Sequence, residues 1–226
     1  GLRPENTLAA FAEALSLGVT TLELDCAVTK DGVVVVSHDP RLNPDVTRDA
    51  LGRFLETHGP ALVALRYDEV QAYDVGRLKP GSAYATRHPE QQPVDGQRIP
   101  RLADVFALVK KSGNALVRFN IETKVFPIKP ELTPPPAPFA EAVVRAVREA
   151  GMEKRAAIQS FDWRTLKIVQ KLAPELTTVA LTSQRPGEDT IGAGQPGPSP
   201  WLAGLDVDDF GGSVPKLVKA SGAAVW

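Results

Sequence analysis

The apolar and polar positions of this chain follow two periods, one typical of helices and the other of strands. Helical spacing of apolar residues predicts a first helix within residues 4–18, with Asn6 as its N-cap. Apolar runs predict strands over 20–28 and 32–39, separated by the turn Lys30-Asp31-Gly32. The two patterns then alternate, with helices predicted over 101–113, 138–151, 163–174 and 214–222 and strands over 115–125, 156–162, 176–183 and 223–226.

The order of these elements predicts an α/β fold. Strands that alternate with helices and are apolar enough to be covered on both faces indicate a parallel sheet. The six predicted strands and their helices fit a (β/α)₈ barrel, the TIM barrel, better than an open doubly wound sheet, which is the alternative. We therefore expect a single barrel domain over residues 1–226.

Three long segments, over 40–98, 126–138 and 184–200, break the alternation of predicted strands and helices. The first is expected to be an insertion at about 40–98. Each segment follows the C-terminal end of a predicted strand, which is the rim where barrel enzymes build their sites. Variable surface loop is nevertheless the simpler interpretation for most residues within these segments.

Composition narrows the class of protein further. The chain has 226 residues, of which 43% are hydrophobic and 23% charged, as in a soluble globular protein with one sizeable core. Its net charge of −1, with no concentrated basic block, gives no reason to expect a nucleic acid as partner. No apolar run reaches the roughly 18 residues of a membrane span, so no stable membrane insertion is expected. The compartment, whether cytoplasmic, periplasmic or secreted, and the oligomeric state are left open.

Two acidic residues interrupt the first predicted strand. Side chains two positions apart on a strand share a face, so Glu23 and Asp25 point to one side while Leu22, Leu24 and Cys26 point to the other. A charge inside a buried strand is costly unless it is paired or bound to a metal. The pattern therefore suggests a site on this strand.

The strand predicted over 115–125 carries a second polar stripe. Its apolar side chains share the helix-covered face, which leaves Arg118, Asn120, Glu122 and Lys124 pointing into the barrel. Three converging carboxylates, from Glu23, Asp25 and Glu122, would repel one another unless a cation neutralised them. Oxygen ligands suit Mg²⁺, Ca²⁺ or Mn²⁺, whereas Zn²⁺ would normally recruit His or Cys. Lys124 is expected to meet an anionic group of the substrate.

His38 ends the second predicted strand. Alternation places Val34, Val36 and His38 on one face, which we take to be the face of the carboxylates. An imidazole with an ordinary pKa of about 6.5 can move a proton near neutral pH. A lone histidine at a strand end is more often structural, but the carboxylates and the adjacent Asp39, which could orient the ring, favour an acid–base role.

Residues 4–42, PENTLAAFAEALSLGVTTLELDCAVTKDGVVVVSHDPRL, closely resemble the start of the glycerophosphodiester phosphodiesterases. The P-E-N-T segment, the E-x-D strand, the T-x-D-G turn and the H-D strand end follow in the family's order. Later motifs of the family resemble IPRL at 99–102, NIETK at 120–124, QSF at 159–161 and GAAVW at 222–226.

This resemblance implies a TIM barrel of the phospholipase-C-like phosphodiesterase type that hydrolyses a glycerophosphodiester to glycerol 3-phosphate and an alcohol. It also implies a divalent cation, Mg²⁺ or Ca²⁺, held by Glu23, Asp25 and Glu122. His38 and Lys124 would be the catalytic residues. The small-molecule substrate would be bound by Lys124, Asn120, Gln159 and Trp226, although a core position for Trp226 is an equal alternative.

One departure from the family concerns the start of the chain. The family pairs two histidines as acid and base, and the first belongs to an H-R-G motif upstream of P-E-N-T. Here residues 1–3 are Gly-Leu-Arg. We therefore expect the sequence to be cut at both ends, with the first barrel strand missing.

Two other functions stay open at this point. One is a phospholipase-D-like enzyme that acts on lysophospholipids or sphingolipids, and the other is a non-catalytic barrel that binds glycerophosphate. The PENT and IPRL motifs favour glycerophosphodiester hydrolysis over the first alternative. The sequence does not decide whether water or the glycerol 2-hydroxyl is the nucleophile.

Overall fold

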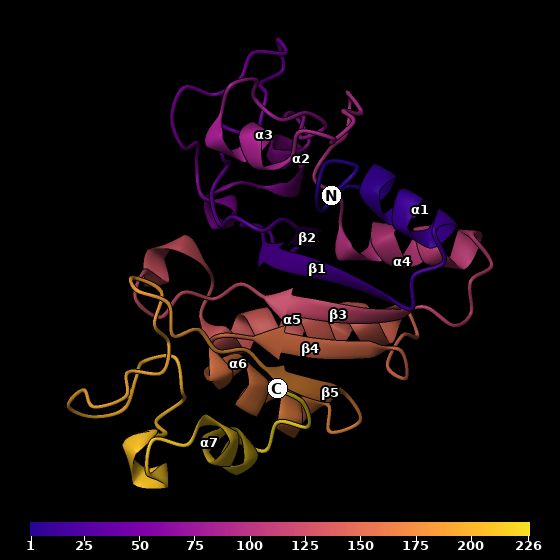
Figure 1. Ribbon diagram of the computed structural model, residues 1–226. Helices are drawn as coiled ribbons and strands as arrows, with labels where there is room; N and C mark the ends of the chain where they lie inside the picture. The colour runs from indigo at the N-terminus through magenta and orange to yellow at the C-terminus, as the bar shows by residue number, and fades with distance from the viewer. The chain divides into compact units, whose positions relative to one another are not determined.

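The computed structural model describes residues 1–226 and divides them into two compact units, Gly1–Arg118 and Phe119–Trp226. Figure 1 labels their elements. Helices alternate with strands along the chain, and the second unit contains a parallel sheet, so the predicted α/β class is confirmed. The single barrel domain over 1–226 stays a prediction, and each unit is described by itself below.

The first helix of the first unit, α1, spans Leu8–Ser16. Its N-cap is Thr7, whose hydroxyl accepts a hydrogen bond from the backbone N–H of Ala10 at 3.2 Å. The prediction that Asn6 caps this helix is wrong, because Asn6 has a φ of 54° and turns its side chain elsewhere.

Strands β1, Thr21–Val28, and β2, Val34–Val36, form an antiparallel hairpin in which Cys26 lies opposite Val36. The expected parallel arrangement is wrong for this pair, because a turn this short can only join antiparallel strands. Within the turn, the Thr29 hydroxyl donates to the Asp31 carboxylate at 2.6 Å and holds the pKa of Asp31 below its usual range.

The segment over 40–98 packs on this hairpin through a shared apolar cluster. It contains the 3₁₀ helix η1, Leu62–Ala64, and the short helices α2, Tyr67–Val70, and α3, Ala83–Arg87. The cluster joins hairpin and insertion through Ala27, Val35, Leu42, Leu62, Val70 and Ile99. Helix α4, Leu102–Lys111, follows and buries Leu102, Val105, Phe106 and Val109, as its apolar spacing predicts.

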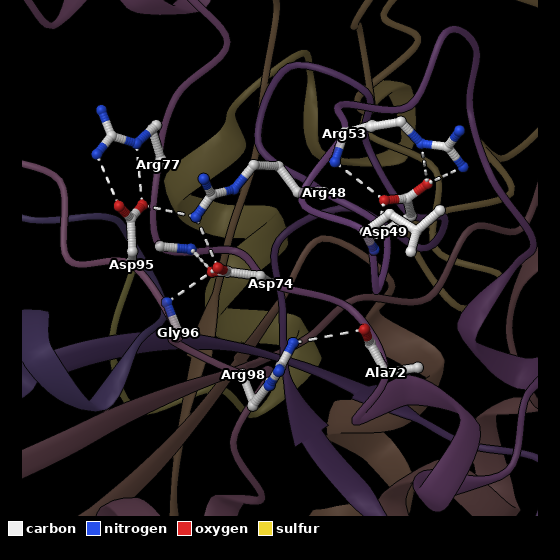
Figure 2. Close-up of polar contacts among 11 residues, drawn as sticks. Arg48, Asp49, Arg53, Ala72, Asp74, Arg77, Asp95, Gly96 and Arg98 are labelled. Carbon is white, nitrogen blue, oxygen red and sulfur yellow. Dashed lines mark hydrogen bonds and ion pairs between the residues drawn. The ribbon is translucent and has the colours of Figure 1, made fainter.

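A polar network also ties the insertion together (Figure 2). The Arg48 guanidinium donates to Asp74 and to Asp95, both at 2.6 Å. Arg77 donates to both oxygens of Asp95 at 2.9 and 2.8 Å, and these bonds lower the pKa of Asp95 to about 2. Between these residues the backbone at Gly76 is so close to Val94 that a Cβ would lie 1.9 Å from its carbonyl oxygen.

Strands β3, Arg118–Thr123, β4, Ala156–Ser160, and β5, Thr177–Ala180, pair in that order and in parallel, and all of their residues except Arg118 belong to the second unit. Helices α5, Pro136–Glu149, and α6, Trp163–Leu172, pack against each other, and α6 covers β4 and β5 (Figure 1). The unit also has the 3₁₀ helices η2, Pro130–Leu132, and η3, Asp208–Phe210, and helix α7, Val214–Ser221.

The predicted last strand over 223–226 is present only as a single parallel bridge, in which Val225 lies beside Val179 of β5. The backbone N–H of Ala180 donates to the Val225 carbonyl at 2.9 Å. None of the helices combines the length and the apolar character that a membrane crossing requires.

Candidate active site

The two faces of β1 carry different kinds of side chain, as alternation predicts. Glu23 and Asp25 share one face, and apolar side chains share the other. Leu22 and Leu24 are buried on the opposite face, with 3% and 0% of their surface exposed. Glu23 is exposed, whereas Asp25 is only 7% exposed. An ionised carboxylate at the depth of Asp25 requires hydrogen-bond donors or a cation.

Asn6 supplies one such donor. Its side-chain amide donates to the Asp25 carboxylate at 2.9 Å, and its amide oxygen accepts from the backbone N–H of Asp25 at 3.3 Å. The P-E-N-T segment therefore does more than lead into α1, since it also contacts the strand that bears the carboxylates. Asn6, Glu23 and Asp25 line an open hollow of about 360 Å³ within the first unit.

The position of His38 is set by the bend that follows β2 and not by alternation along that strand. Val36 lies opposite Cys26, so it shares the apolar face of β1 rather than the face of Glu23 and Asp25. The argument that placed Val34, Val36 and His38 on the carboxylate face is therefore wrong. The strand ends at Val36, and His38 lies in a bend that follows Ser37, whose N–H donates to the Asp25 carbonyl at 2.9 Å.

The His38 ring has the carboxylate partner that its neighbour suggested. Its Nδ1 lies 3.1 Å from the Asp39 carboxylate, which also accepts a bond of 2.6 Å from the Asn43 amide. The His38 side chain is 52% exposed, so a ligand can reach it. Asn6, His38 and Asp39 line one pocket of about 40 Å³.

In the second unit, Glu122 and Lys124 form a buried ion pair on β3 and just beyond it. The Lys124 ammonium lies 3.2 Å from the Glu122 carboxylate, and the two side chains are 10% and 8% exposed. The charge of Glu122 is thus compensated within its own unit, as a buried carboxylate requires.

Asn120 and Gln159 also meet in the second unit. The Asn120 amide donates to the Gln159 side-chain oxygen at 2.6 Å. The Asn120 side-chain oxygen is buried and has no hydrogen-bond partner. Buried polar atoms are nearly always hydrogen-bonded, so this unpaired oxygen is unusual.

Hydroxyl groups hold the C-terminal ends of β3 and β4 in register. The Ser160 hydroxyl donates to the Thr123 carbonyl at 3.0 Å, and the Thr123 hydroxyl lies 3.0 Å from that of Thr165 at the start of α6. All three residues are at most 1% exposed. This network fixes the strand ends on which Glu122 and Gln159 lie.

Trp226 does not lie in the core. It is 59% exposed, and its indole N–H donates to the Thr182 hydroxyl at 3.0 Å. The core alternative for this residue is wrong, and a contact with substrate stays a prediction.

The sequence profile of the glycerophosphoryl diester phosphodiesterase family matches residues 1–219. The chain belongs to this family. Among curated members it is 34% identical, over 174 residues, to the glycerophosphodiester phosphodiesterase of Caldanaerobacter subterraneus subsp. tengcongensis, with 76% of this chain and 59% of that protein aligned. The chain thus spans less than two thirds of the length of that relative.

Solved structures of the phosphodiesterase family have the same fold. A crystal structure from Silicibacter pomeroyi DSS-3, named as a candidate glycerophosphoryl diester phosphodiesterase, superposes with a TM-score of 0.84 at 33% identity and covers 100% of this chain and 70% of its own. An Oleispira antarctica phosphodiesterase, solved in complex with sn-glycerol-3-phosphate, superposes with a TM-score of 0.60 at 19% identity and covers 100% of this chain and 78% of its own. These likenesses confirm the predicted TIM-barrel fold class.

Over a short stretch of 38 residues, 17% of this chain and 12% of the relative, the sequence is 60% identical to a human lysophospholipase D.

Sequence reasoning missed two contacts around the P-E-N-T segment. Asn is both a frequent N-cap and one of the few residues that tolerate a positive φ, and the adjacent Thr7 can cap equally well, so the sequence does not show that Asn6 contacts Asp25. The hydroxyl of Tyr84, in α3 of the insertion, donates to Glu5, and burial together with Glu5 raises the pKa of Tyr84. No local pattern links two residues 79 positions apart.

Proposed function

We propose that this protein hydrolyses glycerophosphodiesters to glycerol 3-phosphate and an alcohol, with the aid of Mg²⁺ or Ca²⁺. The family match over residues 1–219 carries this proposal. The sn-glycerol-3-phosphate bound to the phosphodiesterase of the same fold supports the proposed product.

The cation would be held by Glu23, Asp25 and Glu122. These residues offer only carboxylate oxygens, which suit a hard divalent ion, and Asp25 and Glu122 are buried while Glu23 is exposed. Asn6 already orients Asp25 and Lys124 already compensates Glu122, so both buried carboxylates are held in place before a cation binds. When bound, a divalent cation would reduce the negative charge that repels a nucleophile from the phosphodiester.

His38 would transfer a proton at its Nε2 atom. Because its Nδ1 faces the Asp39 carboxylate, the ring is oriented by that contact and Nε2 is the nitrogen that would act on the substrate. In the family's mechanism a second histidine would complete the acid–base pair.

Lys124 would exchange its contact with Glu122 for the phosphate of the substrate and stabilise the charge that develops on the phosphate oxygens. The unpartnered Asn120 oxygen would accept a hydrogen bond from a substrate hydroxyl, with Gln159 holding the amide in place. Trp226, exposed beside Thr182, would pack against glycerol or the leaving group.

A second candidate function is hydrolysis of lysophospholipids in the manner of a lysophospholipase D, which the short stretch of 60% identity favours. Both reactions cleave a phosphodiester and differ in whether the substrate carries an acyl chain. A non-catalytic barrel that binds glycerophosphate is the remaining alternative.

The test is to incubate the full-length protein with glycerophosphocholine or with lysophosphatidylcholine, in Mg²⁺, in Ca²⁺ or in EDTA, and to measure the phosphate-containing product. We expect glycerol 3-phosphate from glycerophosphocholine, and none in EDTA. Turnover of lysophosphatidylcholine alone would support the second candidate instead. Binding of glycerol 3-phosphate without turnover of either substrate would support the non-catalytic barrel.

A further inference from the structure

We infer that Asn6 is a positioning residue that holds the Asp25 carboxylate in the orientation required to bind a divalent cation. This inference rests on the proposed function, in which Asp25 is a cation ligand. It assigns to the P-E-N-T segment a role beyond the start of α1.

The contact between the two residues fixes both the carboxylate and the strand that bears it. The Asn6 amide nitrogen donates to the carboxylate at 2.9 Å, while its oxygen accepts from the Asp25 backbone N–H at 3.3 Å. A single planar group that bonds to side chain and backbone of the same residue restricts rotation of that side chain. The carboxylate would then be presented to a cation in a fixed direction.

The backbone of Asn6 is held in a conformation that non-glycine residues rarely adopt, with a φ of 54°. Neighbouring bonds maintain it. The Thr7 hydroxyl donates to the Pro4 carbonyl at 2.6 Å and accepts from Ala10, and the Gln97 side chain accepts from the N–H of Ala9 at 3.2 Å. Such conformations persist where the surrounding structure determines them and are common at functional sites.

A group that orients a metal ligand contributes to metal affinity without touching the metal, and its removal typically weakens binding ~10- to 100-fold. Two substitutions separate the loss of the Asn6 amide from the strain of its positive φ. Asn6→Gly and Asn6→Ala both remove the amide, but glycine accepts a positive φ readily and alanine does not. Asn43→Gly is a matched control, because the Asn43 amide donates to Asp39, which is not a proposed cation ligand.

The experiment measures the dissociation constant of Ca²⁺ by calorimetric titration of the full-length protein and its variants, and the urea midpoint of each in EDTA. We expect Asn6→Gly and Asn6→Ala to weaken Ca²⁺ binding equally, by ~10- to 100-fold, although the alanine variant has the lower urea midpoint of the two. Asn43→Gly should bind Ca²⁺ like the parent protein.

Parent-like Ca²⁺ binding by Asn6→Gly would overturn the positioning role, as would a loss confined to the less stable alanine variant or an equal loss in Asn43→Gly. A parent protein that binds neither Ca²⁺ nor, in the same titration, Mg²⁺ would instead refute the cation site of the proposed function, and this inference with it.

Discussion

The Lys124 ammonium lies 3.2 Å from the Glu122 carboxylate, and neither side chain is more than 10% exposed. Removal of one partner of a buried ion pair typically costs about 3–5 kcal/mol, so this contact contributes to stability in the absence of ligand. If Glu122 also binds a cation, Lys124 and the cation compete for the same carboxylate. The pair therefore links stability, cation affinity and phosphate binding.

The first prediction concerns this competition. Lys124→Met keeps much of the side-chain volume but removes the ammonium that lies beside the Glu122 carboxylate, so the metal-free protein should be less stable. Ca²⁺ should bind more tightly than to the parent and should restore much of the lost stability, because a ligand that binds only the folded state stabilises it. Thermal unfolding with and without Ca²⁺ measures both effects, and a variant that is destabilised equally in both conditions would contradict this account.

The second prediction separates the role of His38 from that of the carboxylates. His38→Gln should lower kcat roughly 10²-fold or more, as loss of a general acid or base typically does. The Ca²⁺ dissociation constant should stay at the parent value, because His38 is not among the proposed ligands. Steady-state kinetics and calorimetry measure the two quantities, and turnover close to that of the parent would return His38 to a structural role.

A third prediction concerns how much the Asp95 ion pairs in the insertion contribute to the stability of the protein at low pH. The Arg77 and Arg48 bonds hold the pKa of Asp95 at about 2, below the ordinary value. A carboxylate whose pKa is lowered on folding contributes stability above its unfolded pKa of about 3.9, and this contribution is lost as the pH falls through its folded pKa.

Asp95→Asn should therefore destabilise the protein at pH 5 and much less at pH 2. The comparison of urea midpoints of parent and variant at the two pH values measures this difference. A gap between the two proteins that is as large at pH 2 as at pH 5 would show that the charge of Asp95 is not responsible.

The fourth prediction compares two glycines of the insertion. A Cβ at Gly76 would lie 1.9 Å from the Val94 carbonyl oxygen, so Gly76→Ala requires the backbone to move. Gly81 has a φ of 77° but no atom within 4 Å of such a Cβ, so Gly81→Ala meets only backbone strain. Gly76→Ala should cost more, about 1–3 kcal/mol of unfolding free energy, as overpacking typically does. Equal urea midpoints for the two variants would contradict the packing seen around Gly76.

Local patterns predict most elements of the fold correctly. The apolar spacing of α4 identifies the four residues that it buries, and the alternation of β3 identifies Phe119 and Ile121 as buried. Both patterns depend only on neighbours in sequence, because the helix and strand periods fix which side chains share a face.

The errors arise where pairing, rather than periodicity, decides the direction of a side chain. Side chains do alternate along β2, but the pairing of Cys26 with Val36 decides which face of β1 each of them shares. His38 lies beyond the end of the strand, so alternation does not place it. The bond from Asn6 to Asp25 likewise joins residues 19 positions apart. A single sequence shows neither register nor such contacts.

The most direct test of the central claim, that Glu23, Asp25 and Glu122 jointly bind the cation used in hydrolysis, is calorimetric titration of the full-length protein with Ca²⁺. The parent should bind Ca²⁺ and hydrolyse glycerophosphocholine. Glu23→Gln, Asp25→Asn and Glu122→Gln, tested singly, should each weaken Ca²⁺ binding and lower kcat/KM together. Parent-like Ca²⁺ affinity in all three variants would contradict the claim.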